Sequence, residues 1–153
     1  MGENLDLRKC GNCGYLCTTN GWFKTFEITF GLSIFLCLVI WQHSCGTSYT
    51  HFLLLTSFCF TTMTSLFLTS FIISSTSQAF TSTIVFINFN LLGFVFYFSG
   101  SLTALIRGNA YETQRGLFLA AGLLGLTAGT LHLVDALLAI RLKLRKDNPL
   151  FVN

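Results

Sequence analysis

Charged residues are scarce in this sequence. Only 10% of its 153 residues are Asp, Glu, Lys or Arg, whereas a soluble domain carries about 25%. More than half of the chain, 52%, is hydrophobic, so its folded surface suits lipid better than water. The net charge of +3 is small, and the basic residues stand between and beyond apolar runs. Nucleic-acid-binding proteins spread Lys and Arg over a face or groove, so no nucleic-acid partner is expected.

Several functional motifs are also missing. The sequence contains no nucleophile with a base and an orienting group, no P-loop, no glycine-rich nucleotide fingerprint and no metalloprotease helix. We therefore expect neither an enzyme nor a cofactor. The myristoylation pattern fails because position six is Asp6, and no N-x-S/T sequon is present. The first apolar run is too long for a signal peptide and no cleavage site follows it, so it should be retained.

Four apolar runs are long enough to cross a bilayer as helices, which takes about 20 residues. Helix is favoured over β-barrel because the runs are continuous and because a helix satisfies its own backbone groups in lipid. The links between the runs are short, which makes neighbouring helices antiparallel. The sequence predicts an all-α, up-down four-helix transmembrane bundle over 22–141, with spans at about 22–41, 52–73, 82–106 and 117–140.

The distribution of Lys and Arg predicts the orientation of the bundle. With the N-terminus inside, the outer side holds only Arg107 and Arg115, and the cytosolic side holds seven basic residues: Arg8, Lys9, Lys24, Arg141, Lys143, Arg145 and Lys146. A cysteine-containing tail, 1–21, and a basic tail, 142–153, are therefore both expected in the cytosol. The last four of these residues either bind anionic lipid of the inner leaflet, at about 1 kcal/mol each, or only mark the topology.

Ionisable residues inside the spans are costly in lipid and point to function. Glu27 and Asp135 each lie five residues from the cytosolic end of their span, a depth of about 7 Å at 1.5 Å per residue. Asn88 and Asn90 of the third run reach a similar depth. The sequence predicts a polar layer near the cytosolic face, made of Glu27, Asn88, His132 and Asp135.

Two interpretations of this polar layer stay open. Interhelical hydrogen bonds between such residues stabilise membrane bundles, and the layer is also a candidate proton or ion pathway. Each acid has a basic neighbour near the boundary, Lys24 beside Glu27 and Arg141 below Asp135. Nothing polar continues the layer to the outer side, as a pathway would require.

Small residues recur on one face of the fourth run, where Gly125, Ala128 and Gly129 follow one another at helical spacing. The two glycines form a G-x-x-x-G pair, which allows helices to approach closely. This face serves either packing within the bundle or contact between copies in a homo-oligomer.

Cysteines cluster before the first span, at Cys10, Cys13 and Cys17. Cytosolic cysteines beside a span are candidate S-acylation sites. The alternatives are unmodified thiols and a zinc site, but a tetrahedral site needs four ligands and the tail has three cysteines and no histidine, so we predict no metal. The first outer link holds Cys45 and the second holds no cysteine, so no disulfide can join them.

Two motifs together resemble a known family. The first run opens Gly21-Trp22-Phe23-Lys24-Thr25-Phe26-Glu27, a G-x-x-K-x-x-E pattern, and the fourth ends with His132, Asp135 and then basic residues from Arg141. With four spans, short links and cytosolic ends, the chain resembles the MARVEL-domain family over about 21–145, and especially its smaller members. Claudins and tetraspanins fit less well, because this chain lacks their long outer loop and its cysteine motifs.

The resemblance implies a non-catalytic role in organising specialised membrane regions, in vesicle trafficking, lipid-ordered domains, cell junctions, membrane apposition or cell fusion. It implies the plasma membrane or endosomal and secretory vesicles as the location. Membrane lipids and other membrane proteins, including further copies of the chain, are the expected partners. The alternatives are a small transporter or proton-coupled channel that uses Glu27, His132 and Asp135, and a junction strand-former that associates through Gly125 and Gly129.

Overall fold

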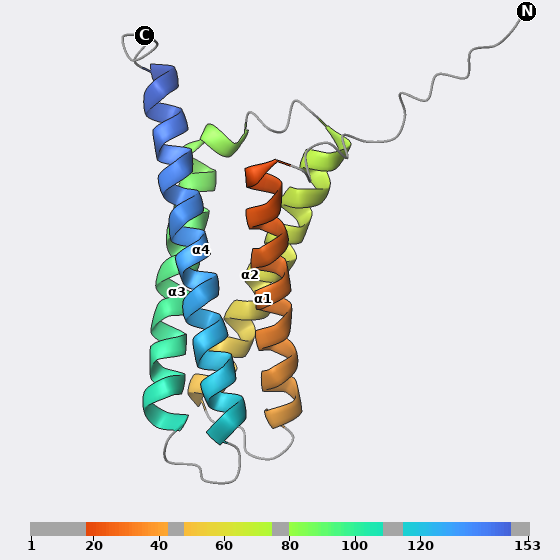
Figure 1. Ribbon diagram of the computed structural model, residues 1–153, viewed down its shortest axis with the longest axis vertical. Coiled ribbons are helices and arrows are strands. Elements are labelled where there is room, and N and C mark those ends of the chain that lie inside the picture. Colours follow the sequence, from red (N-terminus) through yellow and green to blue (C-terminus); the bar gives the residue numbers. More distant parts are fainter. Residues whose placement is uncertain (1–17, 43–47, 75–79, 109–114, 148–153) are drawn as a thin grey trace, which may run out of the picture.

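The structure is a computed structural model that describes residues 18–42, 48–74, 80–108 and 115–147. These segments form four α-helices, which are α1 (Thr19–Gln42), α2 (Ser48–Ile73), α3 (Ile84–Gly108) and α4 (Arg115–Asp147). The described segments contain no strand, and a 3₁₀ turn over 80–82 precedes α3. The predicted all-α four-helix bundle is confirmed (Figure 1).

The helices alternate in direction and enclose one core. Each packs beside its neighbours in the chain, and α4 also packs beside α1. The most extensive of these contacts joins α3 to α4. Helix α1 begins and helix α4 ends at the same end of the bundle, which we call the terminal end (Figure 1). Toward this end α2 leans away from α3.

The helices begin and end within four residues of the predicted spans, except at the end of α4. The prediction ended this span at Ile140, where the apolar run stops, but the helix continues for seven more residues to Asp147. Leu, Lys and Arg are strong helix formers, and a helix does not need lipid around it to continue. The part of the predicted basic tail that the structure describes, 142–147, therefore extends α4.

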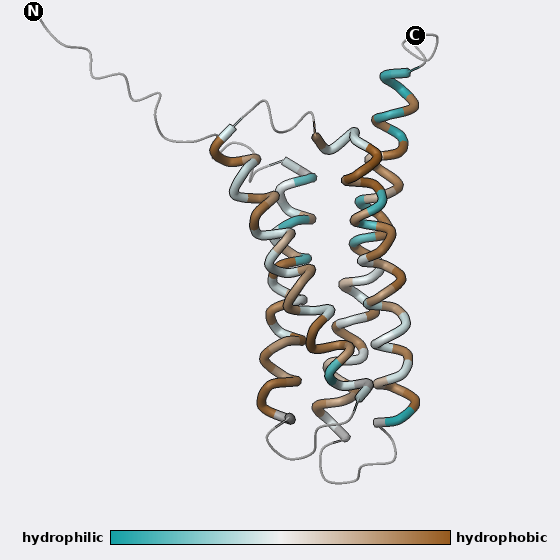
Figure 2. The backbone as a smooth tube through the Cα atoms, turned by 180° about the vertical axis from the view of Figure 1, so that it is seen from behind, coloured by the Kyte–Doolittle hydropathy of each residue, from teal (hydrophilic) through white to brown (hydrophobic). Residues whose placement is uncertain are grey.

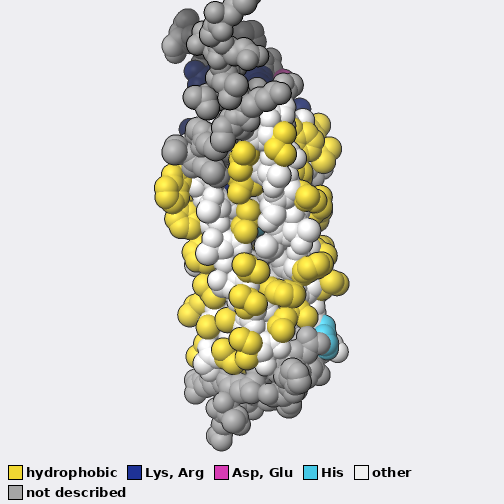
Figure 3. All heavy atoms as spheres, turned by 90° about the vertical axis from the view of Figure 1, so that its right-hand side faces the viewer, with side chains coloured by type: hydrophobic (Ala, Val, Ile, Leu, Met, Phe, Trp, Pro, Cys, Tyr) yellow, Lys and Arg dark blue, Asp and Glu magenta, His cyan; other side chains and the backbone are white. Residues whose placement is uncertain are grey.

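Most of the apolar surface faces outward. Each helix contains a stretch long and apolar enough to cross a membrane, and only 28–39% of that stretch is buried in the bundle. Large exposed side chains such as Leu32, Leu36 and Leu55 follow the helices along their length. Hydrophobic side chains are spread along the face shown in Figure 3, and Lys and Arg appear toward the terminal end. Soluble monomers rarely expose apolar patches this large, so the chain is a multi-pass membrane protein.

The buried apolar side chains form two clusters. The first lies at the terminal end and contains Phe71, Phe86, Ile87 and Ala139. The second fills the remainder of the core and includes Ile34, Leu38, Leu53, Tyr97 and Phe118. Hydrophilic segments of α1 and α4 lie in the terminal half of the bundle (Figure 2). Charged side chains of these segments are buried between the two apolar clusters.

Candidate functional site

Lys24 is the centre of a buried charged cluster on α1, α3 and α4. It shares the inner face of α1 with Glu27, because residues three apart on a helix lie on one side. The lysine is 1% exposed, and its Nζ lies 2.6 Å from Glu27 Oε2 and 2.6 Å from Asp135 Oδ2. A third contact, at 3.2 Å, runs from Nζ to Asn90 Oδ1. An ammonium group has three N–H donors, so every donor of Lys24 has an acceptor.

Asn90 links the lysine to His132. Its Nδ2 donates to the carbonyl oxygen of Phe86, one turn earlier on α3, at 3.0 Å. This hydrogen bond fixes the amide orientation, so Oδ1 is the atom that points into the cluster. Oδ1 accepts from Lys24 Nζ and also lies 3.0 Å from His132 Nδ1. The asparagine therefore joins side chains of α1 and α4 through one oxygen atom.

Glu27 keeps one carboxylate oxygen without an aligned donor. Its Oε2 accepts from Lys24, whereas Oε1 lies 3.2 Å from His132 Nδ1 and receives no hydrogen bond of good geometry from any described residue. The side chain of Glu27 is 0% exposed, so bulk water does not supply the missing donor. An unmatched oxygen at this depth is costly, which makes the Glu27–His132 contact the least satisfied part of the cluster.

Aromatic rings enclose His132 on the side away from the terminal end. The imidazole stacks on Tyr97, with 5.6 Å between ring centroids and 16° between planes. The rings of Phe60 and Phe89 meet it edge-on, at 5.6 and 6.0 Å. Gly93 provides the space for the imidazole, because a Cβ at that position would lie 2.9 Å from His132 Cγ. The cluster is thus closed toward the second apolar cluster.

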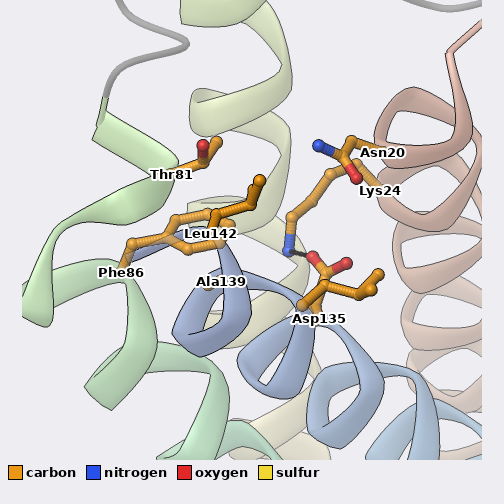
Figure 4. Close-up of a pocket in the computed structure, with 8 residues that line it drawn as sticks. Asn20, Lys24, Thr81, Phe86, Asp135, Ala139 and Leu142 are labelled. Carbon is orange, nitrogen blue, oxygen red and sulfur yellow. Dashed lines mark ion pairs between the residues drawn. The ribbon is translucent and has the colours of Figure 1, made fainter. Parts of the chain in front are cut away.

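A narrow crevice leads from the terminal end to the charged cluster. It offers about 10 Å³ for the centre of a water molecule, which is room for about one water. Figure 4 shows the Lys24–Asp135 ion pair with Asn20 and Thr81 on its two sides. Phe86, whose ring centroid lies 4.9 Å from Lys24 Nζ, forms another wall. Asp135 lies at this crevice, and its side chain is 6% exposed.

The structure brings together Glu27, His132 and Asp135 of the predicted polar layer. Asn88, the predicted fourth member, is instead exposed on the outside of α3, and Asn90 takes its place. Two residues along a helix correspond to a rotation of about 200°, so only one of the two asparagines can face the core. Their equal depth could be predicted from the sequence, but the rotation of α3 could not.

The basic partner of Asp135 also differs from the expectation. The sequence predicts Arg141 below Asp135 and Lys24 at the membrane boundary, but Arg141 is exposed and Lys24 pairs with both acids. A signal for Lys24 was available, since it lies within the first apolar run at a three-residue spacing from Glu27. The sequence paired Lys24 with Glu27 but did not predict its contact with Asp135.

The small residues of α4 lie against α3 inside the bundle. Gly125, Ala128 and Gly129 are all buried. A Cβ at Gly125 would overlap Ser101 Oγ, and a Cβ at Gly129 would lie 3.3 Å from Tyr97 Cβ. This face is therefore occupied by packing within the chain and is not available for a second copy.

The basic residues at the end of α4 lie outside the core. Arg141, Arg145 and Lys146 are exposed, and Lys143 is half-buried. Lys146 Nζ donates to Ser82 Oγ at 2.9 Å, which holds the extension of α4 beside the start of α3. These charges form a collar at the terminal end.

The predicted S-acylation sites Cys10, Cys13 and Cys17 lie outside the described residues. Cys37 and Cys59 are free thiols in the helices. Within the described segments, no group of three His, Cys, Asp or Glu side chains could hold a metal ion.

Comparison with protein-family models, with curated proteins and with solved structures finds no match for this chain. The chemistry of the site follows from its own geometry. Two carboxylates, one ammonium, one amide and one imidazole join three helices in the buried core. Such a group can hold helices together and can bind or release protons.

Proposed function

We propose that this protein is a non-enzymatic membrane-organising protein of the MARVEL type. The proposal is supported by one observation: the two sequence motifs that resemble the family come together in the fold. Lys24 and Glu27 from the first motif meet His132 and Asp135 from the last motif in one buried cluster. Residues from distant parts of the chain therefore act as one unit that joins α1 to α4, which supports treating them as a single family feature.

The proposed protein works through its outer surface and its partners. Its intramembrane charges are enclosed inside the bundle, and its outward surface is apolar along the helices. Such a surface suits lipids and the spans of other membrane proteins. The role that follows is in vesicle trafficking, membrane apposition, cell junctions or cell fusion, at the plasma membrane or in endosomal and secretory vesicles.

Both ends of the chain are proposed to lie in the cytosol. The collar of Arg141, Lys143, Arg145 and Lys146 lies at the terminal end, and Arg107 lies at the opposite end of α3. An excess of Lys and Arg favours the cytosolic side. The same collar is placed to contact anionic lipid of the inner leaflet.

The experiment that tests the proposed function combines a cellular and a reconstituted assay. Cells that lack the protein should show altered cargo delivery or altered cell–cell contact, and expression of the wild-type chain should restore both. The purified protein in liposomes should leave the permeability to protons and small ions at the level of protein-free vesicles. A specific ion or proton flux from the reconstituted protein would overturn the proposal.

A small transporter or proton-coupled channel is the second candidate, because the buried cluster of Lys24, Glu27, His132 and Asp135 contains the groups that such a protein uses. In that case, the changes Glu27→Gln and Asp135→Asn should abolish flux while leaving delivery to the membrane intact. The core beyond Tyr97 argues against a transporter or channel, because no ionisable side chain of the described residues is buried there.

A further inference from the structure

The charged cluster has an odd charge count. Two carboxylates, Glu27 and Asp135, face the single ammonium of Lys24, and His132 is uncharged unless it takes up a proton. With both acids ionised and His132 neutral, the cluster carries one net negative charge. A buried charge without a partner costs several kcal/mol even after relaxation. One added proton brings the net charge to zero.

The unmatched atoms of the cluster indicate where the added proton binds. Glu27 Oε1 lacks an aligned donor and lies 3.2 Å from His132 Nδ1. A proton on the imidazole produces an imidazolium that pairs with Glu27, while Lys24 pairs with Asp135. A proton on Oε1 instead produces a neutral acid beside the imidazole. Both forms are neutral overall, and the proton belongs to the pair rather than to either residue.

All four helices pack around this pair. Helix α1 contributes Lys24 and α4 contributes Asp135, while α3 contributes the uncharged Asn90 and the ring of Tyr97. The side chain that α2 presents to the imidazole is Phe60. No further charged group of the described residues is buried in the bundle, so none is available to balance the second carboxylate.

The crevice reaches the cluster at Lys24 and Asp135, beside the Glu27–His132 pair. The crevice between Asn20 and Thr81 admits about one water beside Asp135 at the terminal end. On the other side, the stacked ring of Tyr97 and the second apolar cluster lie between the pair and the opposite end of the bundle. We infer that the cluster binds one exchangeable proton, held between Glu27 and His132, and exchanges it only with the terminal side of the membrane. The cluster then exchanges a proton with that side without passing it across the membrane.

The first test measures how the unfolding equilibrium depends on pH. Above about pH 7 a free glutamate is ionised and a free histidine is neutral, so the folded protein holds one more proton than the unfolded chain. Stability must then fall as pH rises, with the unfolding constant increasing about tenfold per pH unit until the cluster releases its proton. Denaturation of the wild-type protein in mixed micelles should show this slope, and a flat profile would overturn the inference.

Two variants test whether the excess negative charge causes the pH dependence of stability. Glu27→Gln mimics the protonated acid, so its profile should be flat. Asp135→Asn leaves the Glu27–His132 pair intact but removes the excess negative charge, so its profile should also be flat. A wild-type slope in Asp135→Asn would show that charge balance does not hold the proton. Neither variant leaves an unpaired charge, so both should fold.

Spectroscopy detects the proton directly. A protein with His43→Gln and His51→Gln retains His132 as its one histidine, and nitrogen-15 resonances of that ring distinguish imidazole from imidazolium. The infrared carboxylic-acid band that disappears in Glu27→Gln reports the protonated acid. At neutral pH, one of the two signals should be present. The absence of both would overturn the inference.

One-sided exchange is tested in vesicles of known orientation. Proteoliposomes are separated by capture of an N-terminal tag, so that the terminal side faces either outward or inward. An alkaline step outside should remove the proton signal when the terminal side faces outward and leave it when this side faces inward. Loss at the same rate in both orientations would overturn the one-sided exchange, and proton entry into the vesicles would identify a transporter.

Discussion

Lys24 offsets most of the energetic cost of burying the charged cluster. Each of its three donors has an acceptor, and two of those acceptors are carboxylates. Charges at this depth are costly unless they are paired and hydrogen-bonded. Without the ammonium, Glu27 and Asp135 would be two like charges in the same low-dielectric space. The stability of the core therefore depends more on this residue than on either acid.

We predict that Lys24→Met lowers the free energy of unfolding by about 3–5 kcal/mol, the usual cost of removing one partner of a buried ion pair. Denaturant titration in mixed micelles measures the change. Adding Glu27→Gln and Asp135→Asn to the same chain should recover most of the loss. Arg141→Met, at an exposed position of α4, is the matched control and should have little effect. A Lys24→Met protein of unchanged stability would contradict the ion pairs.

The space for the imidazole depends on Gly93. Gly93→Ala should destabilise the bundle by about 1–3 kcal/mol, because the added methyl group overpacks the core against His132. Gly116→Ala is the control, since a Cβ there meets nothing within 4 Å. In a His132→Ala background the same change at Gly93 should cost less, which a double-mutant cycle measures. Equal losses in both backgrounds would place the ring elsewhere.

At the scale of helices, the contact between α3 and α4 is the most extensive in the bundle. Gly125 and Gly129 remove side chains from α4 where Ser101 and Tyr97 of α3 approach. Membrane helices gain no hydrophobic driving force from lipid and depend on such close packing. The proximity of Gly125 and Ser101 allows their interaction to be measured.

We predict that Gly125→Ala destabilises the bundle by about 1–3 kcal/mol through overpacking. Ser101→Ala alone should be neutral or slightly stabilising, since the Ser101 hydroxyl is buried and has no hydrogen-bond partner among the described residues. In the double variant, Gly125→Ala should cost measurably less than in the wild-type chain. Additive losses, measured by the same denaturation assay, would argue against this α3–α4 contact.

At the scale of the whole molecule, charge is concentrated at one end and apolar surface covers the length of the helices. This asymmetry favours one orientation in the membrane. The links between α1 and α2 and between α3 and α4 should then face away from the cytosol. The chain contains no native glycosylation sequon, so an introduced sequon reports this orientation without background.

We predict that a sequon placed in a lengthened link at 43–47 is glycosylated in the wild-type background. Replacing Arg141, Lys143, Arg145 and Lys146 by Gln reduces the basic residues on the terminal side from seven to three, against two on the other side. Glycosylation should then fall toward a mixture of orientations. Replacing Arg107 and Arg115 by Gln is the control and should keep glycosylation high. Equal glycosylation in all three proteins would show that these charges do not set the orientation.

The number of helices, their approximate ends and the depth of the polar residues could all be predicted from the sequence. Each depends on local quantities: the length of an apolar run against the thickness of the bilayer, and the distance of Glu27 or Asp135 from the end of its run. At the end of α4 the helix and the predicted span differ in length, because the apolar run stops before the helix does. The helix there continues past the apolar run because its residues favour helix in water as well.

The rotation of each helix about its axis was decided only by the tertiary structure. The helices are apolar on most faces, so hydropathy does not indicate which side of α3 faces inward, and Asn90 rather than Asn88 enters the core. The pairing of Lys24 with Asp135 likewise requires two segments distant in sequence to be adjacent in space. The sequence by itself determined the four helices and the depth of their charges. The packing of α1, α3 and α4 decided which charges meet. A buried charge needs a partner within hydrogen-bond distance, and only the packed helices place one there.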